Sequence, residues 1–347
     1  KDQQEGKWWN GSTFTATLVD WRNATGVAPW TLAMPATAWQ SGREYQLSSR
    51  ARDIATNEEG APGAVTFLYD TTRPLTAVTQ PLTATTFYAS LPTISGTASD
   101  PVPGTGLKKA EVDRVELYVQ NPAGNQWNGS GYVAPPFWVV GTGTAAWTYT
   151  ALSGAFASGS TYTVVARAFD LAGNEDVTRS TQTFTFDNAA PTSGITAPVS
   201  GNDYNAFTTI SGTAGDAPAG VAKVDVFSSS GPYYTTSWNG TTFVSGAEVP
   251  NLGSGTDAWS YVMPGAAWTN GVSYRVRSRG TDKVPAGGSG PNVQGGLLPS
   301  ATFLFDTFVP TSTVMTPADG AVLNALATFG GSSTDTVPGT VALVEVS

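Results

Sequence analysis

Acidic side chains are the groups in this sequence whose type and spacing could do chemistry. The 347 residues include no His and no Cys, and 26 Asp and Glu stand against 17 Lys and Arg. Without His or Cys the chain lacks the usual general base, every thiolate nucleophile and most zinc and iron ligands. What remains is carboxylate chemistry, either acid–base catalysis by a carboxylate pair or coordination of a hard cation such as Ca²⁺.

The Asp residues that recur do so at three aligned positions. The first closes an aromatic strand, the second follows a Ser-Gly-Thr-like strand, and the third ends a strand that contains Tyr. In that order the residues are Asp70, Asp187 and Asp306; Asp100, Asp216 and Asp335; and Asp53, Asp170 and Asp282. A catalytic pair normally occurs once in a chain, so this repetition argues for a structural role. We therefore predict that the protein is not an enzyme and has no catalytic residue.

Two interpretations of these Asp residues stay open. Carboxylates at the junctions between repeats could bind Ca²⁺ and stiffen a tandem array. Alternatively, Asp side chains at strand ends accept backbone N–H groups in Asx turns without any metal. Asn57 and Asn174 follow Asp53 and Asp170 by four residues, but no equivalent Ala-Gly-Asn follows Asp282, which weakens the metal interpretation there. The expected cofactor is therefore none, or Ca²⁺.

The elements that carry the Asp residues recur with a period of 111–119 residues. The sequence Trp-Asn-Gly begins at residues 9, 127 and 238, and small-residue segments end in Trp30, Trp147 and Trp259. This pattern predicts complete repeats at residues 71–187 and 188–306. Residues 1–70 then form the C-terminal part of a repeat, and residues 307–347 form the N-terminal part of another, completed by residues like 1–70 of the next copy.

Within each repeat the apolar residues alternate with a period of two, which is typical of half-buried strands. Three Asn-Gly pairs predict hairpins with type I′ turns: Asn10 and Gly11, Asn128 and Gly129, and Asn239 and Gly240. Seven or more short strands in each repeat indicate an antiparallel β-sandwich of the immunoglobulin type. The predicted fold is all-β, with tandem Ig-like β-sandwiches and three repeat units in a permuted frame.

Four motifs resemble a known family. They are Ser-Gly-Thr-Ala-x-Asp, Trp-Asn-Gly, Gly-x-x-Tyr-x-Val-x-x-Arg-Ala-x-Asp-x-Ala-Gly-Asn and Phe-Asp-x-x-x-Pro. Over the whole chain they are similar to the tandem bacterial immunoglobulin-like (Big-type) repeats of very large extracellular surface proteins and adhesins. The resemblance implies an Ig-like fold and an extracellular or cell-surface location. Such repeats serve as stalks, spacers, fibres and adhesive modules, and some related adhesins use calcium at their junctions.

Charged residues at two further aligned positions predict cross-strand ion pairs. One member lies in the strand before the Trp-Asn-Gly hairpin and the other in the Tyr strand. On an exposed outer face each pair would contribute about 0–1 kcal/mol. The third pair requires the tail of one copy to meet the head of another. The pairs are Glu116 with Arg167, Asp225 with Arg279, and Glu345 with Arg50.

Composition narrows the partners of the chain. A net charge of −9 makes nucleic acid an unfavourable partner, and no run of about 18 apolar residues predicts a membrane span in this window. The expected partner is the chain itself, head to tail. Covalent continuation into a next copy is favoured over split-domain strand complementation, because the joined tail and head have 111 residues, which is within the internal repeat range.

We expect a structural segment of an extracellular fibre or cell-surface stalk, built from end-to-end Ig-like domains and without catalysis. One alternative is the spacer region of a bacterial adhesin, with or without calcium dependence. Another is an accessory Ig-like region of a secreted polysaccharide-active enzyme, whose catalytic domain would lie elsewhere.

Overall fold

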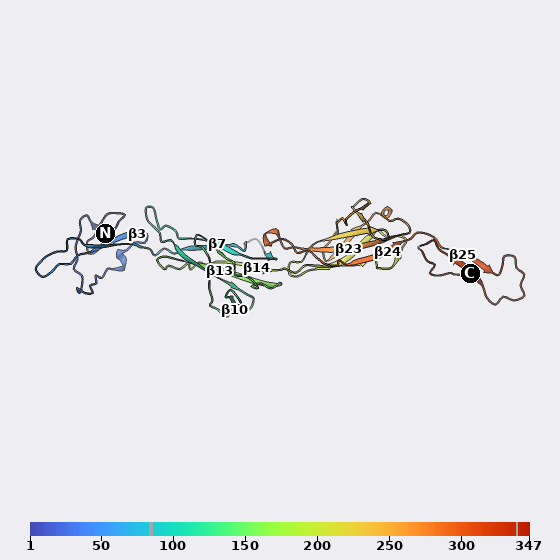
Figure 1. The fold of residues 1–347 in the computed structure, drawn as a ribbon, viewed down its shortest axis with the longest axis horizontal. Coiled ribbons are helices and arrows are strands. Elements are labelled where there is room, and N and C mark those ends of the chain that lie inside the picture. The colour runs from blue at the N-terminus through green and yellow to red at the C-terminus, as the bar shows by residue number, and fades with distance from the viewer. Residues whose placement is uncertain (83–85, 338) are drawn as a thin grey trace. The chain divides into compact units, whose positions relative to one another are not determined.

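The computed structural model describes residues 1–82, 86–337 and 339–347, and it confirms the all-β prediction (Figure 1). Two compact units are present, one of residues 1–86 and 90–186 and the other of residues 87–89 and 187–347. The helical elements of the described residues are three 3-10 helices: η1 (Ala36–Ala38), η2 (Gly265–Ala267) and η3 (Ala286–Gly288). No helix in this part of the chain has the length and apolar character needed to cross a membrane.

The first unit contains a β-sandwich made of strands from residues 75–186. One sheet has the order β10-β9-β8-β13-β14, with β11 paired to β8, and the facing sheet has the order β12-β7-β5. Neighbouring strands in both sheets are antiparallel. The strands are β5 (Leu75–Gln80), β7 (Ile94–Ser99), β8 (Val112–Gln120), β9 (Gln126–Trp127), β10 (Tyr132–Val133), β11 (Val139–Val140), β12 (Ala146–Tyr149), β13 (Ser160–Asp170) and β14 (Ser180–Phe186). The short strand β6 (Phe87–Tyr88) belongs to the second unit.

The second unit contains an equivalent sandwich made of strands from residues 192–305. Its sheets have the orders β16-β24-β23-β18-β19-β20, with β21 paired to β18, and β15-β17-β22. The predicted domain boundaries enclose the strands of each sandwich and stay a prediction. The strands are β15 (Thr192–Ala197), β16 (Asp203–Tyr204), β17 (Thr209–Gly215), β18 (Val221–Ser230), β19 (Thr236–Trp238), β20 (Phe243–Ser245), β21 (Asn251–Leu252), β22 (Ala258–Val262), β23 (Val272–Asp282) and β24 (Ser300–Phe305).

The two remaining parts of the chain form small two-stranded sheets. In the first seventy residues β1 pairs with β2 and β3 pairs with β4, and in the last forty β25 pairs with β26. We call residues 1–70 the head segment and residues 307–347 the tail segment. Their strands are β1 (Trp8–Trp9), β2 (Phe14–Ala16), β3 (Arg43–Ser49), β4 (Gly63–Tyr69), β25 (Thr311–Thr316) and β26 (Gly330–Thr334).

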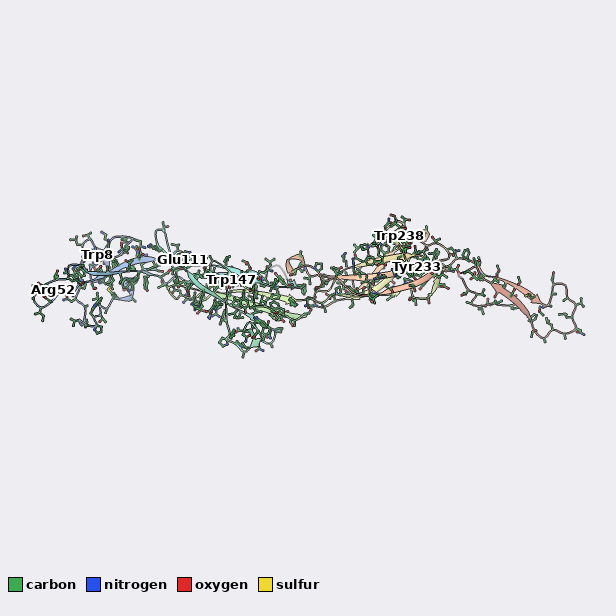
Figure 2. All side chains as sticks on the ribbon, in the orientation of Figure 1. Trp8, Arg52, Glu111, Trp147, Tyr233 and Trp238 are labelled. Carbon is green, nitrogen blue, oxygen red and sulfur yellow. The ribbon has the colours of Figure 1, made fainter. Side chains whose placement is uncertain are left out.

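Tryptophan fills the core of each complete sandwich, between its two sheets. Trp147 and Trp259 are buried, and each ring lies on the glycine of the Ser-Gly-Thr strand that pairs with its own strand. A Cβ added to Gly96 or Gly212 would collide with that ring. Trp127 and Trp238 of the Trp-Asn-Gly motifs are buried as well, and Trp147 and Trp238 mark the two cores in Figure 2. Aromatic burial of this kind replaces the disulfide that antibody domains place in their core.

The Tyr of each Gly-x-x-Tyr motif fixes the loop before its strand. Its hydroxyl accepts a backbone N–H from the residue five positions earlier, an arrangement like the tyrosine corner of Ig-type sandwiches. The N–H···O distances are 3.0 Å from Gln40 to Tyr45, 2.8 Å from Ala157 to Tyr162 and 2.7 Å from Thr269 to Tyr274.

Replacing Tyr162 with Phe is expected to destabilise the first sandwich by about 1–3 kcal/mol, because the Ala157 N–H would lose its partner. Tyr233 is 85% exposed and is the matched control, since Tyr233→Phe removes a hydroxyl that lies in solvent. Urea unfolding of the two variants measures the difference. Equal free energies of unfolding would show that the Tyr162 hydroxyl has no structural role.

The Asn-Gly hairpins form, but with a turn that differs from the expected type I′. In each hairpin the Asn N–H bonds the carbonyl three residues later, so Gly is the first central residue and Asn precedes the turn. The φ angles of Gly11, Gly129 and Gly240 are between +99° and +102°, and the next residue has no positive φ, as in a type II′ turn. The Asn side-chain oxygen accepts two backbone N–H groups ahead of it, which holds this register.

Candidate cation sites at the repeat junctions

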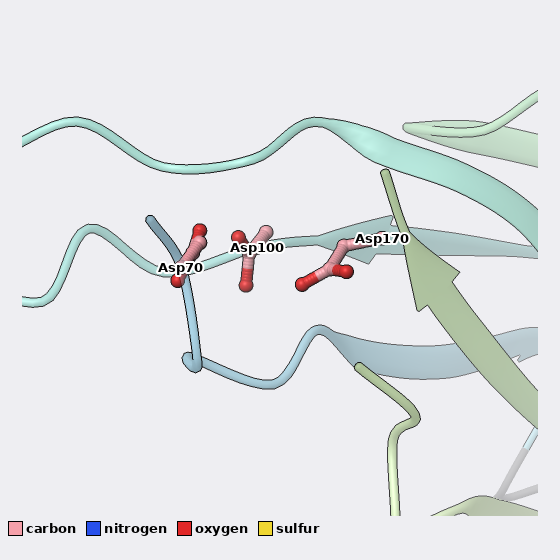
Figure 3. A group of neighbouring side chains, drawn as sticks. All are labelled: Asp70, Asp100 and Asp170. Atoms are coloured by element: carbon pink, nitrogen blue, oxygen red, sulfur yellow. The ribbon is translucent and has the colours of Figure 1, made fainter. Parts of the chain in front are cut away.

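Three Asp residues from three different elements meet at the junction between the head segment and the first sandwich. Asp70 follows β4, Asp100 follows β7, and Asp170 ends β13 (Figure 3). All three are buried, and one carboxylate oxygen from each lies within 4.8 Å of the others. The Asp residues that the sequence placed at different strand ends therefore converge in space.

Hydrogen bonds fix the two outer carboxylates of this cluster. Asp70 accepts the N–H of Ala110 at 2.5 Å on one oxygen and the hydroxyl of Ser41 at 2.9 Å on the other. Asp170 accepts the backbone N–H and the side-chain amide of Asn174, each at 2.8 Å. These contacts are the Asx-type interactions expected as the alternative to metal binding, and two of the three Asp residues make them.

Asp100 differs from its two neighbours. It is 2% exposed, and neither of its carboxylate oxygens has a hydrogen-bond partner. A buried charge without a partner is costly. Burial, followed by the negative charges of Asp70 and Asp170, raises the pKa of Asp100 to about 7. The pKa of Asp70 is lowered instead, since hydrogen bonds from Ala110 and Thr72 outweigh the effect of its burial.

A second cluster with the same composition lies at the start of the second sandwich. Asp187, Asp216 and Asp282 place one oxygen each within 4.8 Å of the others. Asp187 accepts the N–H of Ala219 at 2.9 Å. One oxygen of Asp216 is buried without a partner, and burial, followed by the charges of Asp187 and Asp282, raises the pKa of Asp216.

An Asn side chain ties each cluster to the preceding strand. In the first cluster the Asn174 amide that bonds Asp170 also donates to the Asp70 carbonyl, at 3.2 Å. In the second cluster, Asn292 donates to the Asp282 carboxylate at 2.6 Å and to the carbonyl of the strand-closing Asp at 2.9 Å.

Sequence reasoning missed Asn292. The spacing of Asn174 after Asp170 predicts an Asn four residues after Asp282. The second sandwich has an inserted loop at that place, which contains η3. The Asn therefore returns ten residues after the Asp and fills the same place. Val293, the residue after Asn292, bridges to Thr281 as Glu175, the residue after Asn174, bridges to Phe169.

The remaining three Asp residues form no complete cluster within the described residues. Asp306 and Asp335 lie against the same backbone, since a Cβ on Gly339 would collide with both carboxylates. Asp53 is exposed and is held by Asn57, whose N–H and amide donate to it at 2.8 and 2.7 Å. Its geometry with Asn57 matches that of Asp170 with Asn174.

Two of the three predicted ion pairs come together in the structure. Arg167 lies 2.7 Å from Glu116, and Arg279 lies 2.9 Å from Asp225, in both cases between directly paired residues. The expected exposed face is not what the structure shows, because the carboxylates of both pairs are largely covered. Trp138 stacks on the Arg167 guanidinium at 4.0 Å and shields it from solvent.

The third predicted pair has only one of its members in place. Arg50 bonds Glu58 at 2.7 Å, as Arg167 bonds Glu175 at 2.8 Å, and Trp21 stacks on Arg50 as Trp138 does on Arg167. Glu345 is exposed.

Comparison with known proteins gives structural likenesses. No family model matches the chain, and no curated protein matches it. The fibronectin(III)-like modules of Clostridium thermocellum CbhA share 16% identity over 67% of this chain and 94% of theirs, with a TM-score of 0.30. A tetra-tandem repeat in the extending region of a large adhesion protein shares 16% identity over 82% of this chain and 61% of its own, with a TM-score of 0.27.

A Ca²⁺-stabilised adhesin with which an Antarctic bacterium binds ice shares 15% identity over 79% of this chain and 60% of its own, with a TM-score of 0.30. The strands and registers described above define the class of protein: an all-β chain of tandem Ig-like β-sandwiches.

Proposed function

We propose that the chain is a load-bearing segment of an extracellular stalk or fibre, in which Ca²⁺ at successive junctions stiffens a row of Ig-like domains. The observation that carries the proposal is the recurrence of the buried Asp cluster. Asp70, Asp100 and Asp170 at one junction correspond one for one to Asp187, Asp216 and Asp282 at the next. Repetition from one junction to the next is what a mechanical role requires and what a single catalytic centre would not show.

The donor set of each cluster fits Ca²⁺. Carboxylate oxygens are the hard ligands that this cation prefers, and backbone carbonyls and water complete its six to eight ligands. The buried, unpartnered oxygens of Asp100 support cation binding at this cluster, because a cation would offset their charge. Asp70, Asp100 and Asp170 would hold the ion, and Asn174 would keep Asp170 in place.

A bound cation would join two successive parts of the chain. Asp70 closes the head segment, whereas Asp100 and Asp170 belong to the sandwich that follows, so the ion would be ligated from both sides of the junction. The Asn174 bond to the Asp70 carbonyl already links the same two parts. Ligation from both sides limits rotation about the linker, and length then grows with the number of repeats.

Small-angle X-ray scattering with Ca²⁺ and with chelator tests the mechanical part of the proposal. With Ca²⁺ we expect a larger maximum dimension and a sharper pair-distance distribution, because the junctions no longer bend freely. Scattering curves that superpose under both conditions would contradict calcium stiffening. Mg²⁺ is the control cation, since its smaller, strictly octahedral shell suits a flexible multi-carboxylate site less well.

A further inference from the structure

The head and tail segments each expose apolar side chains that are buried in both complete sandwiches. Trp30 of the head is 46% exposed, whereas the aligned Trp147 and Trp259 are 1% and 2% exposed. Phe329 of the tail is 70% exposed, whereas the aligned Ile94 and Ile210 are fully buried. Leu47 and Phe67 in the head, and Val344 and Val346 in the tail, are exposed in the same way while their aligned residues are buried.

Within the described residues, the tail sheet has no strand in the place that β12 and β22 take in the complete sandwiches. In the complete sandwiches the Ser-Gly-Thr strand is central, with β7 between β5 and β12 and β17 between β15 and β22. The tail counterpart, β26, pairs with β25 alone. At Gly331 the nearest atoms belong to Thr313 and Val314, and no indole is among them, whereas Gly96 and Gly212 each carry one.

The head segment holds the missing strand in the right local conformation. A bridge between residues six positions apart links each core strand to the loop before it. The head forms the same bridge as the two sandwiches do: Thr25 with Thr31, Thr142 with Thr148, and Ser254 with Ser260. Trp30 therefore directly precedes the second residue of the bridge, as Trp147 and Trp259 do. By the register of Trp147 on Gly96, Trp30 would pair with Gly331 and Thr31 with Gly330.

The second sheet shows the same complementarity. β13 and β23 each pair with a strand on both edges, whereas their counterpart β3 pairs with β4 on one edge. On its other edge, residues 1–3 bond only the first half of β3, as far as Gln46, and among the described residues no strand pairs beyond that point. Arg167 holds the two carboxylates Glu116 and Glu175, whereas Arg50 holds only Glu58. The place left beside Arg50 is the one that the alignment assigns to Glu345.

We infer that the tail segment of one copy docks on the head segment of a second copy and completes a third Ig-like sandwich. The occupant of the exposed head face is residues 307–347, whose own apolar side chains are covered in the same step. Docking also brings Asp53 of the second copy to Asp306 and Asp335, so an acid cluster incomplete in one copy is completed by another. Chain continuation across the junction would use the same contacts. This inference does not depend on calcium, because strand pairing and apolar burial carry it.

Disulfide trapping between two variants of the 347-residue chain tests the inference, since the chain contains no Cys. One variant carries Thr31→Cys and the other Gly330→Cys. A Cβ at Gly330 meets nothing closer than the Thr316 side chain at 3.8 Å, so the substitution fits. Mixed in chelator under mild oxidant, the two variants should form a covalent dimer. The matched control replaces Gly330→Cys with Ser312→Cys, which is exposed on β25, the wrong strand.

A third variant separates docking from chance collision. Trp30→Ala added to the Thr31→Cys chain should lower the yield of trapped dimer at least tenfold, whereas Leu18→Ala, which removes a residue that is already 79% exposed, should leave it unchanged. Thermal unfolding of each variant alone verifies that the fold is kept. A yield with Gly330→Cys no higher than with Ser312→Cys, or a yield that Trp30→Ala leaves unchanged, would overturn the inference. Because the assay runs without Ca²⁺, its failure leaves the calcium proposal standing.

Discussion

Replacing Asp100 and Asp216 together with Asn is expected to stabilise the chain in chelator and to abolish its stabilisation by Ca²⁺. Each of the two Asp residues has a buried oxygen without a partner, and each faces two other carboxylates. An amide of the same shape removes the unfavourable charge and can donate hydrogen bonds to the neighbouring carboxylates. The same change removes a charged ligand from each cluster, so Ca²⁺ binding should weaken sharply.

The expected size of the effect follows from linkage. At a free Ca²⁺ concentration one hundred times the dissociation constant, one site stabilises the fold by about 2.7 kcal/mol. For a domain of about 100 residues this is a rise in melting temperature of roughly 10 °C or more. Thermal unfolding with Ca²⁺ and with chelator measures it. The wild type should show the rise and the double variant should not.

The gain in chelator should depend on pH. The pKa of Asp100 in the fold, about 7, is above its ordinary value of 3.8, so the metal-free wild type loses stability as the pH rises from about 4 to about 7. The double variant should therefore exceed the wild type more at pH 8 than at pH 5. Asp113→Asn, at an exposed residue paired with Arg114, is the control and should change neither comparison. A double variant that still gains stability from Ca²⁺ would contradict the assignment of these ligands.

Replacing Trp259 with Ala is expected to destabilise the second sandwich by about 3–5 kcal/mol, the usual loss for a large aromatic side chain in a core. The ring is 2% exposed, lies on Gly212, and donates its N–H to the Thr213 carbonyl at 3.1 Å. Because native domains have a margin of about 5–15 kcal/mol, this loss approaches unfolding. Urea unfolding followed by circular dichroism measures it.

Trp30→Ala is the matched control for Trp259→Ala within the same chain. The two residues occupy the same position in the repeat, but Trp30 is half exposed. In dilute solution we expect Trp30→Ala to cost about 1 kcal/mol or less. Losses of equal size would mean that the head segment has a closed core of its own, in conflict with the exposed face described above.

The periodic features of the fold were predictable from the sequence. Alternating strands, the Trp residues that fill the cores and the three aligned Asp positions all depend on local pattern or on spacing, both of which a repeat displays several times. Asp70, Asp100 and Asp170 could be named as recurring strand-end residues, but not as one cluster, because their meeting depends on how strands far apart in sequence pair.

The features that could not be predicted from the sequence depend on an inserted loop, on side-chain hydrogen bonds and on packing between residues far apart in sequence. Asn292 lies beyond an inserted loop, so a fixed spacing after Asp282 could not find it. The hairpins shift by one residue because the Asn10 side chain bonds backbone N–H groups ahead of it and so takes the position before the turn. The burial of the Arg167 ion pair depends on Trp138, a side chain from a loop 29 residues earlier in the sequence.

Isothermal titration of the metal-free chain with Ca²⁺ tests the central claim most directly. At dilutions where the chain is monomeric, the two complete clusters predict two Ca²⁺ ions bound per chain. Binding should be tighter at pH 8 than at pH 5, and both ions should be lost in the Asp100→Asn and Asp216→Asn double variant. No Ca²⁺-dependent heat at either pH, or the same stoichiometry in the double variant, would contradict the account.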